Sequence, residues 1–296
     1  MNSDRLRDLI RNQNSNISFE EYRIRYATER FLLRVQKSAY DKNLVLKGGF
    51  LLGTIFKVEQ RTTKDLDTLI TELSADRQQV EMMLKSIIQV ELNDNVKFEL
   101  MDLVDSQQQR IYDGFKAKLK MEFLGERTFV NFDLDLGVGD VITPKIQNIN
   151  IPLIFNEAQG EKNKISLLAY PLETILAEKT EIILYLGTDN SRMKDFYDIY
   201  LILNDPQKPD SEILYQAFEN TWNFRHPELQ IDSEKFEDWY YTIDSILENE
   251  YMNGVAWNNY IKDRPYAKGL KLQAIVLQFK SHLSDLEKVY TQLKGS

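Results

Sequence analysis

The sequence predicts an α+β protein, with a mixed α/β domain over residues 1–164 followed by a mainly helical domain over residues 165–296. Two segments, residues 115–123 and 130–136, place apolar residues at every second position, which is typical of β-strands. From Pro171 onward the apolar residues recur at helical spacing and few strand candidates remain. We therefore place the domain boundary near residue 165.

The remaining elements of the first domain follow from local patterns. Residues 17–40 predict a helix, because Ser18 and Glu21 have capping-box spacing and a periodic apolar face follows them. Gly48 and Gly49 predict a turn before an apolar run, and residues 63–71 alternate like a half-buried strand. Helical periodicity also covers residues 75–93, and a glycine at 125 predicts a hairpin between the two strands named above.

Composition excludes several classes of site. The chain has no cysteine, which rules out disulfides, thiolate zinc sites and cysteine nucleophiles. Its two histidines, His226 and His282, are too few for a histidine-rich metal centre. Neither a signal-peptide pattern nor a bilayer-spanning apolar run is present, so we expect a cytoplasmic protein with no membrane segment.

The net charge of −9 argues against indiscriminate binding to nucleic acid, which requires clustered cations. A local basic track is still compatible with this charge. Arg23, Arg30, Arg34 and Lys37 share one stripe of the predicted helix. That stripe is either a solvated helix face or a track for RNA.

The strongest chemical signal is a pair of aspartates that follows the glycine pair. Asp65 and Asp67 occupy alternate positions of a predicted strand, so both carboxylates project from one face. Two adjacent carboxylates repel each other unless a cation intervenes, and Mg²⁺ is usually held by one or two carboxylates together with substrate phosphates. Gly48 and Gly49 would allow backbone amides to approach a phosphate closely.

A third carboxylate is available on the strand at residues 130–136. Asp133 and Asp135 share the face opposite the apolar residues, so either one could reach a metal. Asp135 lies nearer the break at Gly137, where an active-site edge is more plausible. The alternative is a strand with one wet face and no chemistry.

The helix after Pro171 contains a lysine within its apolar stripe. Lys179 must reach water or meet an anion, because burying an unpaired ammonium is costly. Its partner is either a nucleotide phosphate or a structural carboxylate. On the phosphate reading, Lys179→Met would impair transfer and leave stability similar or higher. The next helix, capped by Ser191, carries Asp195 in its first turn, where an acidic residue ordinarily stabilises the helix dipole.

Together these segments resemble the AbiEii/AbiGii family of nucleotidyltransferase-like toxins from abortive-infection toxin–antitoxin pairs. Three blocks match in the correct order: glycines 48–49 with R-x-T-x-D-x-D at 61–67, then D-x-G-x-G-D at 135–140, then E-K at 178–179 with R-x-K-D-F-Y-D at 192–198. The resemblance is clear over about residues 44–205 and thin beyond them.

The resemblance implies a polymerase β-like nucleotidyltransferase core and a helical C-terminal domain that contributes to the site. Asp65 and Asp67 would hold Mg²⁺, with Asp135 as the third acidic ligand. Lys179 would contact the nucleotide triphosphate and Asp195 would complete the catalytic set, while a part for Asp198 is left open.

The same resemblance implies nucleotide binding by Gly48, Gly49 and Thr63. Thr63 stands where a serine is frequent in the family. The glycine pair replaces a Gly-Ser motif and lies farther from the aspartates than that motif does in the family.

The function implied is that of a toxin that transfers NMP from an NTP to the 3′ end of tRNA and causes growth arrest in phage abortive infection. A separate winged-helix antitoxin would act without stable contact. Two alternatives are an enzyme that nucleotidylates proteins and a non-catalytic module that binds nucleotide or RNA.

Overall fold

A computed structural model describes the chain over residues 1–13, 17–58, 65–74, 76–106, 114–155, 163–207 and 209–294. Arg61 and Thr63 of the sequence motif lie outside these ranges. Contacts divide the chain into two units. The sheet unit comprises Met1–Asp140 and Gln147–Ala169, and the helical unit comprises Val141–Ile146 and Tyr170–Ser296.

Within the described residues of the sheet unit, seven strands form one mixed sheet in the order β3-β4-β5-β2-β1-β7-β6. Strand β2 pairs in parallel with β5, and β1 in parallel with β7, whereas the other neighbours are antiparallel. The strands are β1 (Leu44–Leu46), β2 (Asp65–Ile70), β3 (Val96–Asp105), β4 (Gly114–Phe123), β5 (Phe129–Val138), β6 (Gln147–Pro152) and β7 (Lys164–Ala169).

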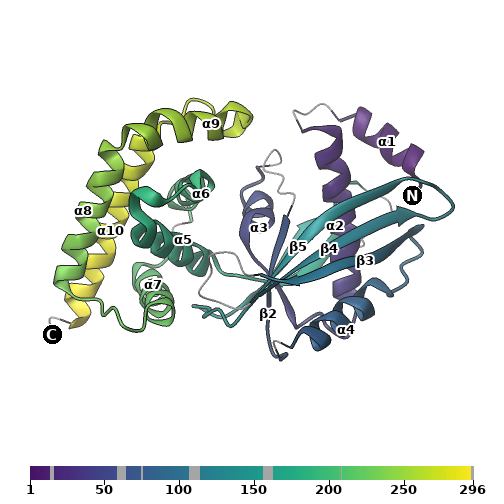
Figure 1. The fold of residues 1–296 in the computed structure, drawn as a ribbon, viewed down its shortest axis with the longest axis horizontal. Coiled ribbons are helices and arrows are strands. Elements are labelled where there is room, and N and C mark those ends of the chain that lie inside the picture. The colour runs from purple at the N-terminus through teal and green to yellow at the C-terminus, as the bar shows by residue number, and fades with distance from the viewer. Residues whose placement is uncertain are drawn as a thin grey trace. The chain divides into compact units, whose positions relative to one another are not determined.

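Helices cover the sheet where its strands present apolar side chains. Helix α2 contacts β5 and β7, α3 contacts β2, and α4 contacts β3 (Figure 1). Phe31 of α2 packs edge-on against Phe98 and Phe132, at ring distances of 6.2 and 6.0 Å. The helices of this unit are α1 (Ser3–Arg11), α2 (Phe19–Lys37), α3 (Gly48–Ile55) and α4 (Arg77–Ile88).

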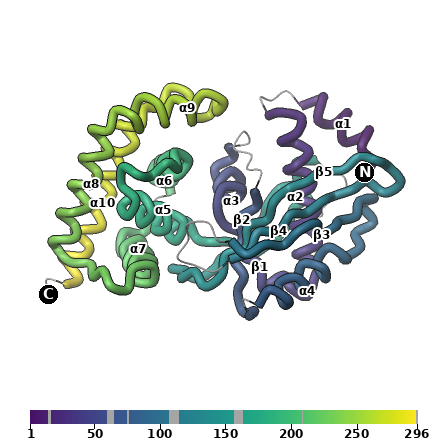
Figure 2. The backbone as a smooth tube through the Cα atoms, viewed as in Figure 1, coloured from purple at the N-terminus to yellow at the C-terminus, as the bar shows by residue number. Residues whose placement is uncertain are grey.

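The helical unit is built around the long helix α10, which contacts α6, α7 and α8 (Figure 2). Trp222 and Trp239 pack edge to face in its core at a ring distance of 4.7 Å. Its elements are α5 (Leu172–Leu186), η2 (Gly187–Asp189), α6 (Met193–Leu203), α7 (Ser211–Arg225), α8 (Ser233–Glu248), the π-helix η3 (Tyr251–Ala256), α9 (Trp257–Lys262), η4 (Pro265–Ala267) and α10 (Leu272–Lys294).

The structure confirms the α+β class and the predicted N-terminal helix. Ser18 and Glu21 form the expected capping box at the start of α2. The glycine pair is not a turn, because α3 begins at Gly48. Ser191 does not cap α6: the N-cap residue is Arg192, whose backbone amide donates to Asn190 Oδ1 at 2.8 Å.

Strand β7 locates the division between the units. A boundary at residue 165 would cut this strand, which pairs with β1 inside the sheet, and the division in the structure follows the strand at Ala169. The segment Val141–Ile146 belongs to the helical unit although it lies between two strands of the sheet. In the described part of the chain, no helix has the length and apolarity needed to cross a membrane.

Candidate active site

The candidate active site lies on one face of the sheet, where β2 and β5 run in parallel. Their register pairs Asp65 with Asp133 and Asp67 with Asp135. The intervening residues, Leu66 among them, are buried on the opposite face, as strand alternation requires. The structure therefore brings the predicted Asp65, Asp67 and Asp135 together, and it places Asp133, the alternative third carboxylate, on the same face.

A lysine from the neighbouring strand β4 lies among these carboxylates. Lys116 Nζ is 3.1 Å from Asp133 Oδ2, 3.7 Å from Asp65 Oδ1 and 3.8 Å from Asp135 Oδ1. Partial burial opposes its charge, but the hydrogen bond to Asp133 and the nearby negative charges raise the pKa of Lys116 above its ordinary value. This ammonium therefore supplies positive charge beside three of the carboxylates, those of Asp65, Asp133 and Asp135.

Sequence reasoning missed Lys116 although a signal was present. In the β4 segment the apolar residues alternate with lysines, so the polar face of this strand is cationic. Only the apolar half of that pattern contributed to the prediction of a strand. The register with β5, which places Lys116 opposite Asp135, follows from pairing and not from the β4 sequence alone.

The glycine pair positions Asp67. The Gly49 amide donates to Asp67 Oδ2 at 3.3 Å, and the Lys47 amide donates to the Asp67 carbonyl at 3.0 Å. Gly48 has a φ of +68°, and a Cβ there would lie 2.1 Å from Asp67 Oδ2. Glycine is therefore required both by backbone conformation and by the close approach of the carboxylate.

A second ion pair closes the same end of the sheet. Lys47 Nζ contacts Asp140 Oδ2 at 2.5 Å, and both side chains are largely buried. The two ends of the D-x-G-x-G-D block therefore differ: Asp140 forms an ion pair with Lys47, and Asp135 lies on the carboxylate face.

The donor chemistry of this face fits a hard divalent cation. Oxygen ligands from Asp67 and Asp135 are neighbours across β2 and β5, and Mg²⁺ needs only one or two carboxylates when substrate phosphates complete its shell. Among the residues described here, no three acidic or histidine side chains are already arranged as a metal-binding group. Asp133 and Asp135 are each paired with an aspartate of β2, so the geometry does not distinguish between them as the third ligand.

The helical unit contains the other predicted residues. Lys179 Nζ contacts Asp195 Oδ1 and Asp198 Oδ2, each at 2.7 Å. Arg192 Nε contacts the second oxygen of Asp195 at 2.8 Å. Lys179 therefore has carboxylate partners, and Asp195 is a buried member of an ion-pair network in addition to standing in the first turn of its helix.

Charge and burial act in opposite directions on Asp195. Burial alone would raise its pKa, but the positive charges of Lys179 and Arg192 outweigh that effect and lower the pKa below its ordinary value. Asp195 is consequently held as an anion. The expected effect of Lys179→Met on stability therefore changes sign, from similar or higher stability to a loss.

The proposed basic track on α2 is wrong for two of its members. Arg30 and Arg34 are buried, with 5% and 2% of their surface exposed. Arg34 makes a bidentate pair with Asp94 at 2.8 and 2.9 Å and lies over the Phe98 ring. Arginine is suited to this burial because its planar fork can satisfy a carboxylate with two hydrogen bonds.

One known protein family matches this chain over most of its length. The sequence profile described as "Nucleotidyl transferase AbiEii toxin, Type IV TA system" matches residues 30–263. The chain is also similar to the crystal structure of JHP933 from Helicobacter pylori, with 11% identity and a TM-score of 0.47, over 95% of this chain and 97% of that one. No curated protein matches the sequence. Because the family profile spans most of the sequence and includes both aspartate clusters, the chain belongs to the AbiEii family of nucleotidyl transferase toxins of type IV toxin–antitoxin systems.

Proposed function

We propose that this toxin is a magnesium-dependent nucleotidyltransferase with a polymerase β-like core, which transfers NMP from an NTP to the 3′ end of tRNA. The family supports the transferase class and the toxin role. The observation that carries the proposal is the parallel pairing of β2 with β5, which presents Asp65, Asp67 and Asp135 on one face. Both substrates bear phosphates, which carboxylates repel. A face of aspartates can therefore bind them only through a metal cation.

In this proposal Asp65, Asp67 and Asp135 hold the magnesium ion. When bound, the ion would neutralise charge on the triphosphate and align its α-phosphorus. The chain's own residues prepare that site: the Gly49 amide orients Asp67, and the Lys116 ammonium offsets the repulsion between the carboxylates until the metal and nucleotide arrive. The acceptor hydroxyl then forms a bond to the α-phosphorus, and the bond to pyrophosphate breaks.

The roles of the other predicted residues stay predictions. The resemblance gives Lys179 contact with the triphosphate and Asp195 a place in the catalytic set, while in the structure the two contact each other. The Asp67 carboxylate occupies the space beside the Gly48 Cα. Nucleotide binding by the glycine pair would therefore have to use backbone amides at the N-terminus of α3. Thr63, outside the described residues, keeps its predicted role in nucleotide binding.

The biological setting that we propose follows the family. A toxin of this class implies an antitoxin. We propose that the antitoxin is a winged-helix protein that acts without stable contact, and that growth arrest follows from tRNA that cannot be aminoacylated during phage infection.

The test incubates the purified protein with Mg²⁺, each NTP labelled at its α-phosphate, and total tRNA. Label retained on tRNA, with release of pyrophosphate, is the expected result. Asp67→Asn should reduce the rate by at least about a hundredfold, because a metal ligand contributes several kcal/mol to transition-state stabilisation. The matched control is Asp41→Asn, which changes an exposed aspartate of the same unit and should leave the rate unchanged.

Three outcomes would overturn parts of the proposal. Label on protein in place of RNA would assign protein nucleotidylation. Nucleotide binding without pyrophosphate release would assign a non-catalytic module. Full activity of a folded Asp67→Asn variant would remove the carboxylate face from the mechanism altogether.

A further inference from the structure

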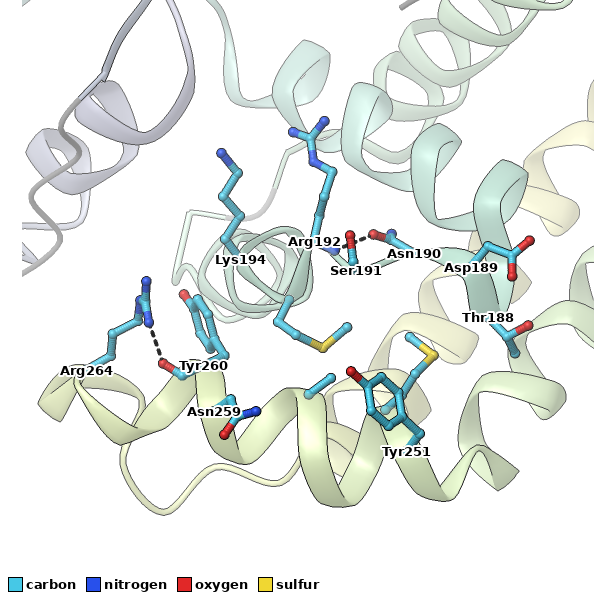
Figure 3. A pocket seen from close by; sticks show the side chains of 13 residues that line it. Thr188, Asp189, Asn190, Ser191, Arg192, Lys194, Tyr251, Asn259, Tyr260 and Arg264 are labelled. Atoms are coloured by element: carbon cyan, nitrogen blue, oxygen red, sulfur yellow. Dashed lines mark hydrogen bonds between the residues drawn. The ribbon is translucent and has the colours of Figure 1, made fainter. Parts of the chain in front are cut away.

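The helical unit contains a pocket of its own, remote in sequence from the carboxylates of β2 and β5. The pocket has a volume of about 510 Å³, within the range of ligand-binding pockets. Residues from the start of α6, from the π-helix η3 and from α9 line it (Figure 3). None of these residues has a part in the proposed metal site.

The lining of this pocket is cationic although the protein is acidic. Arg192, Lys194 and Arg264 line it, and Asp189 is the acidic residue among the lining side chains. The whole chain carries a net charge of −9. A concentration of positive charge in a hollow on an acidic protein attracts anions locally, because low-dielectric walls focus the field.

The lining cations differ in how firmly they are held. Arg264 donates to the Tyr260 carbonyl at 2.7 Å and lies 4.5 Å from the centre of the Tyr260 ring. The Nε atom of Arg192 contacts Asp195 at 2.8 Å. Lys194 is exposed at the beginning of α6. Two guanidinium groups are thus fixed by the protein, and one ammonium can adapt to a ligand.

Aromatic and amide side chains complete the lining. Tyr251 is 66% exposed, so its ring is available at the pocket wall. Asn259 from α9 adds an exposed amide. Cations interleaved with exposed tyrosine are the features by which proteins bind single-stranded nucleic acid, since the cations contact phosphates and the rings stack on bases.

We propose that this pocket binds the phosphodiester backbone of single-stranded RNA, and this inference rests on the proposed function because it assigns the pocket to the acceptor strand. The two substrates of a nucleotidyltransferase are both anionic, but they need different partners. A triphosphate with its metal ion requires carboxylates, which β2 and β5 supply. A phosphodiester without a bound metal requires arginine and lysine, which this pocket supplies.

The test measures binding of a labelled single-stranded RNA of about twelve nucleotides to the full chain, by fluorescence anisotropy at several salt concentrations. Lys194→Ala and Arg264→Ala should each weaken binding about three- to tenfold and lower the salt slope by about 0.7 for each phosphate that the variant no longer neutralises. Lys288→Ala is the matched control, because Lys288 is an exposed lysine of the same unit and does not line the pocket. Its affinity and salt slope should equal those of the unaltered protein.

Further arms separate the sources of phosphate and the two proposals. Free NTP and inorganic tripolyphosphate are titrated without metal against the same variants. If Lys194→Ala and Arg264→Ala weaken the binding of these ligands but not of RNA, the pocket belongs to the nucleotide and its assignment to RNA is overturned. If Arg264→Ala fails to fold, Lys194→Ala decides, because that side chain is exposed. RNA binding that both pocket variants leave unchanged refutes the inference even when transferase activity is present. Pocket-dependent RNA binding without any transferase activity supports the inference while the proposed function fails.

Discussion

Replacing Lys179 by methionine tests whether its ion pairs stabilise the helical unit. The side chain is 12% exposed, and those of Asp195 and Asp198 are 1% exposed. Methionine has a similar length and would pack where the lysine stem now lies. The substitution therefore removes the charge with little change in volume, and it leaves two buried carboxylates without their shared cation.

The expected destabilisation is large. Removing one partner of a buried ion pair costs about 3–5 kcal/mol, because the remaining charge is uncompensated. Arg192 still contacts Asp195 after the change, and methionine adds apolar packing, so we expect a net loss of about 3 kcal/mol at pH 7. In the unaltered protein Asp195 has a lowered pKa, so its contribution to stability is present above the unfolded pKa and is lost as the pH falls through the folded value. The deficit of the variant should accordingly shrink in acid.

The assay is urea unfolding followed by tryptophan fluorescence. All three tryptophans of the chain, Trp222, Trp239 and Trp257, lie in the helical unit, so this signal reports the unit that contains Lys179. Lys288→Met is the control for an exposed lysine of the same unit and should change the free energy of unfolding by no more than about 0.5 kcal/mol.

A triple variant supplies the second control. Replacing Lys179 by methionine and both aspartates by asparagine removes the uncompensated charges, so it should recover much of the stability. If Lys179→Met alone leaves the free energy of unfolding unchanged or higher while nucleotide affinity falls, the ion pairs are not structural and the triphosphate role predicted from the sequence is correct.

Two further predictions concern the sheet unit. Gly48→Ala should weaken binding of Mn²⁺, measured by titration, because the new Cβ would displace the Asp67 carboxylate. Gly125→Ala is the control, since Gly125 has a similar φ of +77° but no atom within 4 Å of the new Cβ. Equal effects of the two changes on Mn²⁺ binding would reject steric displacement. Glu29 is buried, and burial raises its pKa to about 7, so the stability that this group contributes is complete below pH 4.5 and is lost as the pH rises through about 7. Far-UV circular dichroism should show unfolding free energy falling by up to about 3 kcal/mol between pH 5 and 8, and Glu29→Gln should remove that slope; a slope that persists in the variant would assign it to another group.

The sequence predicted those parts of the fold that depend on local pattern. The alternation in β4 and β5 and the capping box of α2 are properties of neighbouring residues, and the structure contains all three. The same alternation indicated that Asp65 and Asp67 share a face, which the structure confirms. The spacing of apolar residues along the chain indicates the side of a strand or helix on which a residue lies. It does not indicate which other strand or helix packs against that side.

The errors about charged side chains concern partners that are distant in sequence. Arg34 looked like one member of a basic stripe because Asp94, sixty positions away, was not identifiable as its partner. Lys116 was missed because its place among the aspartates depends on the register of β4 with β5. Lys179 had two admissible partners in the sequence, and only the packing of α5 against α6 shows which carboxylates it contacts.

The two lysine–aspartate clusters also differ in how easily their cation can be exchanged. The Lys116 side chain is 42% exposed, and its carboxylate partners are 25–47% exposed. Solvent screens these partly exposed pairs, so each contributes less than a buried pair and a divalent ion could take the place of the ammonium at a smaller cost. The buried pairs of Lys179 would cost several kcal/mol to separate. This difference supports the proposal that a metal ion binds on the face formed by β2 and β5, whereas the buried ion pairs in the helical unit hold their groups in place.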